Sequence, residues 1–263
     1  MAADPIFADP HIVHETLAHR GVEVWWVDLD DLPAVSPAAY LALLDETEQH
    51  RAARFLRERD RRAFVAAHAL TRALLAVVLA QPPHTLRFVH GPKGKPDLHP
   101  DHGAPRVRFN LSHTTSAVVC AVAHDHALGV DIENRHREAE YLAVAQTHFA
   151  APEIARLRAA APQERAATFF AIWTLKEAYV KAHGAGLTIP LADFTVESTP
   201  PGIAFSPAIE DRPENWQLQL FEPDARHLIA LALAAPANPP RPVQLRRVEL
   251  AQAAALAQRI AAG

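Results

Sequence analysis

The chain has 263 residues, of which 49% are hydrophobic and 21% are charged, an ordinary balance for a globular protein. That length holds one large domain or two small ones. The net charge of -4 and the isoelectric point near 6.5 argue against a nucleic-acid binder that relies on bulk electrostatics. The single cysteine, Cys120, excludes an internal disulfide and a CxxC metal site, and its apolar neighbours predict a buried, inert thiol.

The N-terminus and the hydropathy pattern carry no signal for export or for a membrane span. Residues 1–10 contain two aspartates and lack the basic and apolar regions of a signal peptide. No run approaches the roughly 18 apolar residues that a membrane span needs. We therefore expect a cytoplasmic protein that binds neither membranes nor nucleic acid.

The first half of the chain predicts one strand, two helices and a group of strands. Ser36-Pro37 gives a helix N-cap followed by proline at the first helical position. The segment 90–96 is rich in glycine and proline and predicts a turn. The expected elements are a strand at 22–27, helices from Ser36 to about Phe55 and from about Asp60 to Ala80, and strands around 107–109, 116–123 and 128–133.

The second half predicts a similar mixture. Helices are expected from about Ala139 to Phe149 and from about Glu164 to His183, the latter ended by Gly184. A second α+β half beginning near Ala127-Leu128-Gly129 follows from this pattern. Its expected strands lie at 194–196, 216–221 and 227–233, and a proline-rich connection at 236–242 leads to a strand at 243–248 and an alanine-rich helix.

Two acids flank Ile132 in the strand expected at 128–133. Because side chains alternate along a strand, Asp131 and Glu133 would share one face, while Val130 and Ile132 would point into the core. Two adjacent carboxylates repel each other unless a cation lies between them. Taken alone, the pair is nevertheless more typical of a solvated strand end than of a metal site.

A second group of candidates lies in the helix expected at 164–183. Trp173, Glu177 and Lys181 follow one another at i, i+4 spacing and therefore share a helix face. By itself, this spacing favours a Glu–Lys ion pair beside an aromatic anchor over a catalytic group.

Candidate anion-binding residues lie earlier in the chain. Ser112 and His113 are expected where a strand ends and a turn opens, so they could bind an anion, or Asn110 and Ser112 could satisfy the turn backbone. The arginine-rich stretch 51–62 and the lysines of the 90–96 loop could be solvated surface or a phosphate site. No nucleophile elbow, Walker loop or GxGxxG motif is present.

Taken in order, four segments resemble the surfactin-type 4′-phosphopantetheinyl transferases, the longer members of that superfamily with two halves. They occur in the family's order and at its approximate spacing, over roughly residues 51–196. The segments are Gly94-Lys95-Pro96, Asn110-Leu111-Ser112-His113, Gly129-Val130-Asp131-Ile132-Glu133, and Trp173-Thr174-Leu175-Lys176-Glu177-Ala178-Tyr179-Val180-Lys181 with Gly184-Ala185-Gly186-Leu187 after it.

The resemblance implies an α+β fold of two similar α/β halves in a pseudo-twofold arrangement, with the active site at their interface. We expect an N-terminal half at 1–127, a C-terminal half at 128–240 that carries the magnesium-site acids, and a C-terminal extension of unknown role at 241–263. A single chain would then make the site, so a monomer is expected.

The implied activity is transfer of the 4′-phosphopantetheine arm of coenzyme A to a serine of an apo acyl or peptidyl carrier protein, with release of adenosine 3′,5′-bisphosphate. Asp131, Glu133 and Glu177 would hold Mg²⁺, whose other ligands would come from the pyrophosphate of coenzyme A. Glu177, alone or through a metal-held water, would take the serine proton. Lys181 would steady the departing phosphate.

The resemblance also assigns coenzyme A contacts. Ser112 and His113 would contact the phosphates. Lys95, with Pro96 beside it, would lie against the adenosine end. The predicted neighbours of the 3′-phosphate are Arg51 and Arg72.

Two other interpretations stay open at this point. The same three acids could serve another magnesium-dependent phosphodiester or phosphoryl-transfer enzyme with a nucleophilic water. The chain could also be a non-catalytic module that binds carrier proteins, although no structural need explains Asp131, Glu133, Glu177 and Lys181 together. The carrier pathway, whether fatty acid, polyketide or nonribosomal peptide, is not specified by the sequence.

Overall fold

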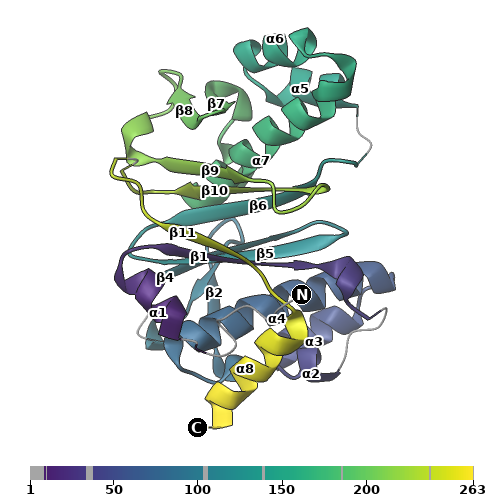
Figure 1. Cartoon of the computed structure of the whole chain (residues 1–263), viewed down its shortest axis with the longest axis vertical. Coiled ribbons are helices and arrows are strands. Elements are labelled where there is room, and N and C mark those ends of the chain that lie inside the picture. Colours follow the sequence, from purple (N-terminus) through teal and green to yellow (C-terminus); the bar gives the residue numbers. More distant parts are fainter. Residues whose placement is uncertain are drawn as a thin grey trace. The chain divides into compact units, whose positions relative to one another are not determined.

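The computed structural model describes residues 9, 11–33, 38–102, 106–137, 140–184, 186–236 and 238–262. The chain forms two compact units (Figure 1). The first unit contains residues 1–126 and 242–263, and the second contains residues 127–241. Both combine helices with antiparallel strands, which confirms the predicted α+β class. The pseudo-twofold relation between the halves and a site shared by them stay predictions.

A four-stranded sheet organises the first unit. Its strand order is β11-β1-β5-β4, with β11 parallel to β1 and the other neighbours antiparallel. A separate two-stranded hairpin, β2–β3, contains the predicted glycine-proline turn. The strands are β1 (Val22–Asp28), β2 (Phe88–His90), β3 (Pro96–Leu98), β4 (Val107–His113), β5 (Ala117–His124) and β11 (Val243–Arg247).

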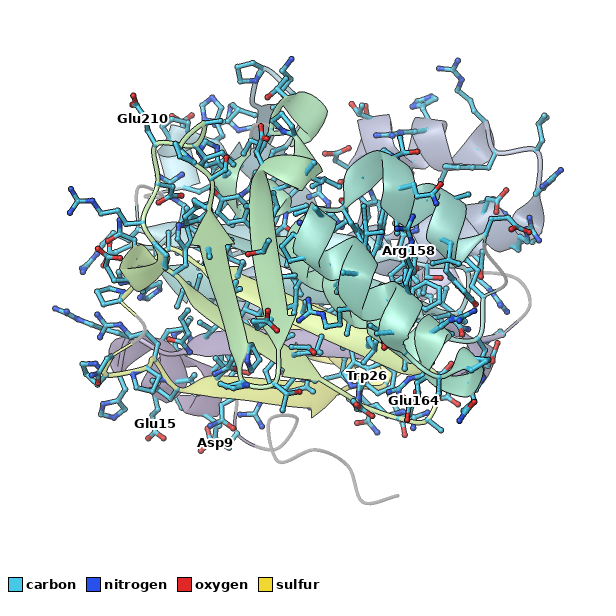
Figure 2. All side chains as sticks on the ribbon, turned by 90° about the horizontal axis from the view of Figure 1, so that it is seen from above. Asp9, Glu15, Trp26, Arg158, Glu164 and Glu210 are labelled. Atoms are coloured by element: carbon cyan, nitrogen blue, oxygen red, sulfur yellow. The ribbon has the colours of Figure 1, made fainter. Side chains whose placement is uncertain are left out.

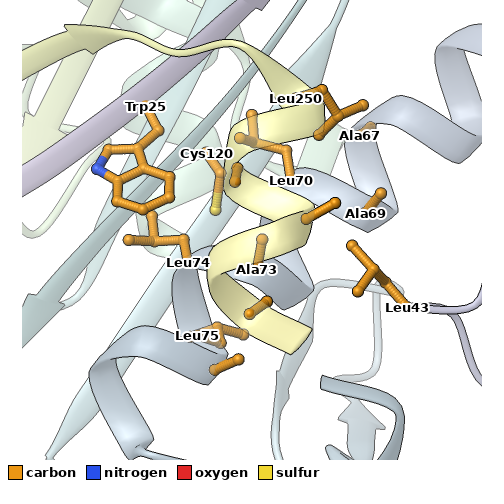
Figure 3. Close-up of a cluster of buried hydrophobic side chains, with 14 of the residues drawn as sticks. Trp25, Leu43, Ala67, Ala69, Leu70, Ala73, Leu74, Leu75, Cys120 and Leu250 are labelled. Atoms are coloured by element: carbon orange, nitrogen blue, oxygen red, sulfur yellow. The ribbon is translucent and has the colours of Figure 1, made fainter. Parts of the chain in front are cut away.

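Helix α4 (Glu58–Leu79) is the central helix of the first unit and confirms the helix expected at about 60–80. It packs against β4, β5 and the C-terminal helix α8 (Leu250–Ala262). Figure 3 shows Leu70 and Leu74 of α4 in one cluster with Leu250 and Cys120. Cys120 is buried as expected, and burial raises the pKa of its thiol to about 12, so the thiol is inert.

The length and apolar composition of α4 would also suit a membrane span. Among the helices that the structure describes, it is the one that meets both criteria. Most of its apolar window is buried within the unit, however, as in a core helix. The expectation that no segment has the length and apolar composition of a membrane span therefore does not hold for α4.

The prediction of a single helix from Ser36 to about Phe55 is wrong over the residues that the structure describes. The structure has two short helices instead, α2 (Ala38–Leu41) and α3 (Glu46–Ala53), after α1 (His11–Ala18). Asp45 begins α3 with a capping box: its Oδ1 accepts a hydrogen bond from Glu48 N at 2.9 Å, and Glu48 Oε2 accepts one from Asp45 N at 3.2 Å. This cap starts a new helix and interrupts the continuous helix that the sequence pattern predicted. Ser36 and Pro37 lie outside the described residues.

The C-terminal segment belongs to the first unit, which corrects the expectation of a separate extension at 241–263. Strand β11 extends the sheet along β1, and α8 covers α4 with its apolar side (Figure 1). Arg246 Nε lies 2.9 Å from Oε2 of the buried Glu23 on β1. Backbone pairing, apolar packing and this ion pair therefore make the segment part of the fold.

The second unit is built on an antiparallel sheet with strand order β6-β10-β9. Its long helix, α7, packs against β6 and β10 and ends as predicted at Gly184, which adopts a left-handed conformation with φ of 74°. The other elements include a hairpin, β7–β8. The bounds are β6 (Leu128–Asn134), β7 (Phe194–Ser198), β8 (Pro201–Phe205), β9 (Gln217–Phe221), β10 (His227–Leu233), α5 (Tyr141–His148), α6 (Ala151–Ala159) and α7 (Arg165–His183).

Helix α6 and strand β8 are elements that the sequence pattern did not predict, and Ala139, the expected start of α5, lies outside the described residues. Arg158 of α6 is exposed, and its side chain can be followed in Figure 2. Glu153, on the buried side of α6, forms an ion pair of 2.8 Å with the buried Lys176 of α7. Lys176 also donates to the Leu191 carbonyl at 2.7 Å, so this pair ties α6, α7 and the segment before β7 together.

Candidate active site

Strand β6 and helix α7 of the second unit lie against each other with their backbones in close contact. A Cβ at position 129 would collide with the Ala178 carbonyl oxygen and the Ala182 nitrogen of α7, so only glycine fits there. Because strand side chains alternate, Asp131 and Glu133 share with Gly129 the face of β6 that α7 covers. The close approach at Gly129 thus brings the acids of β6 to the helix that carries Glu177 and Lys181.

Each acid of β6 has a cationic neighbour. Lys181 Nζ of α7 lies 2.6 Å from Asp131 Oδ1, and Asp131 is only 5% exposed. Arg137 Nη2 lies 3.4 Å from Glu133 Oε1, and the Trp173 side chain also hydrogen-bonds Glu133. The face of α7 that carries Trp173 and Lys181 therefore points at Asp131 and Glu133. This contradicts the interpretation of β6 as a solvated strand end and of the α7 residues as a surface ion pair.

The three acids influence one another electrostatically. Burial raises the pKa of Glu133 to about 7, and the charge of Asp131 adds to this, while Arg137 and Lys181 oppose it. Burial also raises the pKa of Glu177, again with a contribution from Asp131. The charge of Asp131 thus opposes ionisation of both Glu133 and Glu177, a repulsion that a bound cation would relieve.

The fit of this group to a metal depends on its donor chemistry. Among the described residues, no set of three or more His, Cys, Asp or Glu side chains is already arranged to hold a metal ion. Asp131 binds Lys181 instead. Mg²⁺ does not require a protein cage, since it is usually held by one or two carboxylates, waters and substrate phosphates. The carboxylates of β6 and α7 fit that pattern.

Stability of the metal-free protein should depend on Glu133. Its folded-state pKa of about 7 lies above the ordinary value of 4.5, so the folded state binds more protons between these pH values. The free energy of unfolding should therefore fall as pH rises from about 4.5 to 7. At pH 8 in excess chelator, Glu133→Gln should be more stable than wild type by up to about 3 kcal/mol.

Urea unfolding at pH 4.5 and pH 8 measures this difference. Most of the gain should disappear at the lower pH, where Glu133 is protonated in the folded state and half-protonated in the unfolded state. An equal gain at both pH values would show that the substitution acts through packing rather than charge.

A separate cavity of about 440 Å³ lies in the first unit. Its lining includes the apolar side chains of Phe64, Phe88 and Phe109. Four of the six coenzyme A contacts predicted in this unit also line it, namely Arg51, Arg72, Pro96 and His113.

Lys95 lies in the hairpin turn between two residues that line the cavity, Gly94 and Pro96. Burial lowers the pKa of Lys95 to about 8; Asp97 opposes this shift and Arg108 adds to it. The amino group therefore loses its charge just above neutral pH.

Arg72 is held by protein groups, which argues against its predicted role at the 3′-phosphate. Its side chain is fully buried, with Nε 2.5 Å from Glu48 Oε2 and a further ion pair to Asp45. Its Nη1 donates to the carbonyl oxygens of Pro83 at 2.6 Å and Leu86 at 2.9 Å. Four of its five N–H groups are thus directed at protein acceptors.

Ser112 and His113 do not line the same cavity. A turn was expected at Ser112 and His113. Strand β4 instead continues through His113, so both residues lie in the strand. Phe109, Asn110, Leu111 and His113 of this strand line the cavity, whereas the buried Ser112 does not. Of the two predicted phosphate contacts, the cavity includes only His113.

Comparison with known proteins identifies the chain's relatives. The model of a family described as the 4′-phosphopantetheinyl transferase superfamily matches residues 127–232. A second model, described as 4′-phosphopantetheinyl transferase, N-terminal, matches residues 36–125. HetI of Nostoc sp., a 4′-phosphopantetheinyl transferase, is 31% identical over 219 residues, which cover 83% of this chain and 90% of HetI.

The chain belongs to the 4′-phosphopantetheinyl transferase superfamily. Sfp of Bacillus subtilis is 26% identical over 76% of this chain and 86% of its own length. The human L-aminoadipate-semialdehyde dehydrogenase-phosphopantetheinyl transferase is 26% identical over 72% of this chain and 66% of its own. The resemblance to surfactin-type transferases is confirmed, and the other phosphodiester enzyme and the non-catalytic module are not favoured.

Among the residues of this transferase's cavity that sequence reasoning missed are His68 and Glu48. His68 Nδ1 lies 2.7 Å from Glu48 Oε1. A signal was available, because Phe64, His68 and Arg72 are spaced i, i+4 along α4 and so lie on one face.

Proposed function

We propose that this 4′-phosphopantetheinyl transferase uses a magnesium ion held by Asp131, Glu133 and Glu177 when it transfers the arm of coenzyme A to a carrier-protein serine. Coenzyme A as donor and a carrier protein as acceptor follow from the family. The observation that supports the proposal is the packing of the α7 face with Glu177 and Lys181 against the acids of β6. Magnesium, when bound there, would neutralise charge on the phosphate oxygens.

The side chains of α7 would handle the proton and the leaving group. The pKa of Glu177 is raised by burial and by Asp131, which makes its carboxylate a stronger base for the proton of the acceptor serine. Lys181, held 2.6 Å from Asp131, would donate from its ammonium to the departing phosphate. Adenosine 3′,5′-bisphosphate leaves as the serine oxygen forms the new bond to phosphorus.

The first-unit cavity is proposed to accept the adenosine end of coenzyme A. Its volume of about 440 Å³ lies within the usual range for small-molecule sites. Phe88, Phe109 and Pro96 offer an apolar wall for the base, and the exposed Arg51 offers a guanidinium for the 3′-phosphate. Lys95 and Ser112 remain proposed contacts of coenzyme A, and only the family resemblance supports them.

We further propose that the enzyme works as a cytoplasmic monomer on apo acyl or peptidyl carrier proteins, without nucleic acid or membrane. Size-exclusion chromatography with light scattering tests the oligomeric state. A stable dimer at assay concentrations would contradict the monomer.

Intact-mass spectrometry of an apo-carrier tests the reaction and its metal requirement together. With coenzyme A and magnesium, each carrier should gain one phosphopantetheine, and a carrier whose acceptor serine is replaced by alanine should gain none. Excess chelator should stop the transfer, and added manganese or magnesium should restore it. Undiminished transfer in chelator would refute the metal-dependent mechanism while leaving the transferase activity in place.

A further inference from the structure

The ionised side chains that line the first-unit cavity cancel one another. Asp45 and Glu48 contribute two negative charges, and Arg51 and Arg72 contribute two positive charges. A phosphate dianion would therefore meet no net positive charge from these four residues. A further cation among the lining residues would therefore favour the binding of a phosphate.

His68 is a lining residue that the structure holds in a position to supply that charge. Its Nδ1 lies 2.7 Å from Glu48 Oε1, and its ring lies against that of Phe64 with a centroid distance of 4.1 Å and a tilt of 35°. Burial alone would raise the pKa of Glu48, but its contacts with His68 and Arg72 lower it overall. Glu48 is thus a carboxylate that accepts the proton of Nδ1. Among the described residues, none hydrogen-bonds the other ring nitrogen, Nε2.

We propose that His68 is a specificity-determining ligand of the 3′-phosphate of coenzyme A and that Glu48 is its positioning residue. As the dianion enters the cavity, Nε2 takes one proton from solvent and donates it in a hydrogen bond to a phosphate oxygen; no other bond changes. Arg51, whose guanidinium lies 5.2 Å from the centroid of the same Phe64 ring, provides the second cation. The inference rests on the proposed binding of the adenosine end in this cavity.

Any test must distinguish proton uptake by His68 from proton uptake by the other titratable groups around the cavity. Asp45, Glu48, Arg51 and Arg72 are already paired or permanently charged at neutral pH. The groups that could also take up a proton are His90 of β2, His113 of β4 and Lys95 in the hairpin turn.

Calorimetric titration with coenzyme A and dephospho-coenzyme A, which differ only in the 3′-phosphate, tests the proposal. The titrations are run at pH 8, where a phosphate monoester with a second pKa near 6 is already a dianion, in two buffers of different ionisation enthalpy. Wild type should take up more protons with coenzyme A than with dephospho-coenzyme A. His68→Gln should lose this extra uptake and bind coenzyme A about tenfold more weakly, with dephospho-coenzyme A affected less than about twofold.

His90→Gln is the matched control, because His90 lines the same cavity and has no assigned contact to coenzyme A, and the extra proton uptake should persist in it. His113→Gln and Lys95→Met remove the other two proton acceptors; both should bind the two donors more weakly, because they alter proposed contacts, but the difference in proton uptake between the donors should persist. Equal uptake of protons with both donors in wild type would overturn the proposal, and this result does not depend on the folding of any variant. Extra uptake that survives in His68→Gln but disappears in a control would overturn it as well. Wild-type transfer to an apo-carrier is measured separately: its absence refutes the proposed function, whereas transfer with equal proton uptake refutes only the role of His68.

Discussion

Replacing Arg72 with methionine is expected to lower the free energy of unfolding by about 3–5 kcal/mol, because it leaves two carboxylates without their cation. Arg72 is fully buried and bridges Asp45 and Glu48. Its Nη1 also satisfies the carbonyl oxygens of Pro83 and Leu86. Urea unfolding of wild type and variant measures the loss.

Arg51→Met is the matched control, since Arg51 lines the same cavity but is exposed. Its stability should change by less than about 0.5 kcal/mol. The ratio of kcat/KM for coenzyme A to that for dephospho-coenzyme A should fall about tenfold in Arg51→Met, because a charge-assisted contact to the 3′-phosphate is lost. In a folded Arg72 variant the ratio should fall less than in Arg51→Met, because Arg72 is bonded to protein acceptors and not to the 3′-phosphate. A collapse of the ratio in Arg72→Met without loss of stability would return Arg72 to the phosphate site.

Glu177→Gln should reduce the single-turnover rate of transfer by about 10²- to 10⁴-fold, the usual contribution of a general base. Asp131→Asn should cause a loss of similar size, because it removes a proposed metal ligand and the partner of Lys181. The fold should survive both changes, since the pKa of Glu177 is already raised by burial and amides are close in size to the acids.

Glu210→Gln is the control for these acids, because Glu210 lies on an exposed loop, as Figure 2 shows. It should keep the wild-type rate. Circular dichroism and thermal melting in chelator separate loss of chemistry from loss of fold. Near-normal transfer in both Glu177→Gln and Asp131→Asn would contradict the assignment of the site.

Local patterns predicted the elements whose signal is contained within a few residues. The apolar runs of β1 and β5, the helical spacing of α4 and the stop of α7 at Gly184 are of this kind. The break between α2 and α3 depends on the Asp45–Glu48 capping box, which a continuous helical pattern masks. The place of β11 could not be predicted, because its pairing with β1 joins residues more than 200 positions apart.

The candidate site also combines features that local sequence patterns predict with features that depend on tertiary structure. Strand alternation and helix spacing correctly gave the faces of Asp131, Glu133, Glu177 and Lys181, and Gly129 explains why they meet. The burial and pairing of Arg72 could not be predicted, because sequence shows a basic residue without showing its partners, and Asp45 lies 27 positions away. The burial of Ser112 and the pairing of His68 with Glu48 likewise depend on tertiary structure.

Manganese binding measured by electron paramagnetic resonance in the presence of coenzyme A tests the central claim most directly, namely that the carboxylates of β6 and α7 hold the metal. Wild type and Glu210→Gln should bind one manganese ion per chain with the same affinity. Asp131→Asn, Glu133→Gln and Glu177→Gln should each weaken binding at least about tenfold, which is about 1.4 kcal/mol. Unchanged manganese affinity in all three variants would contradict the account.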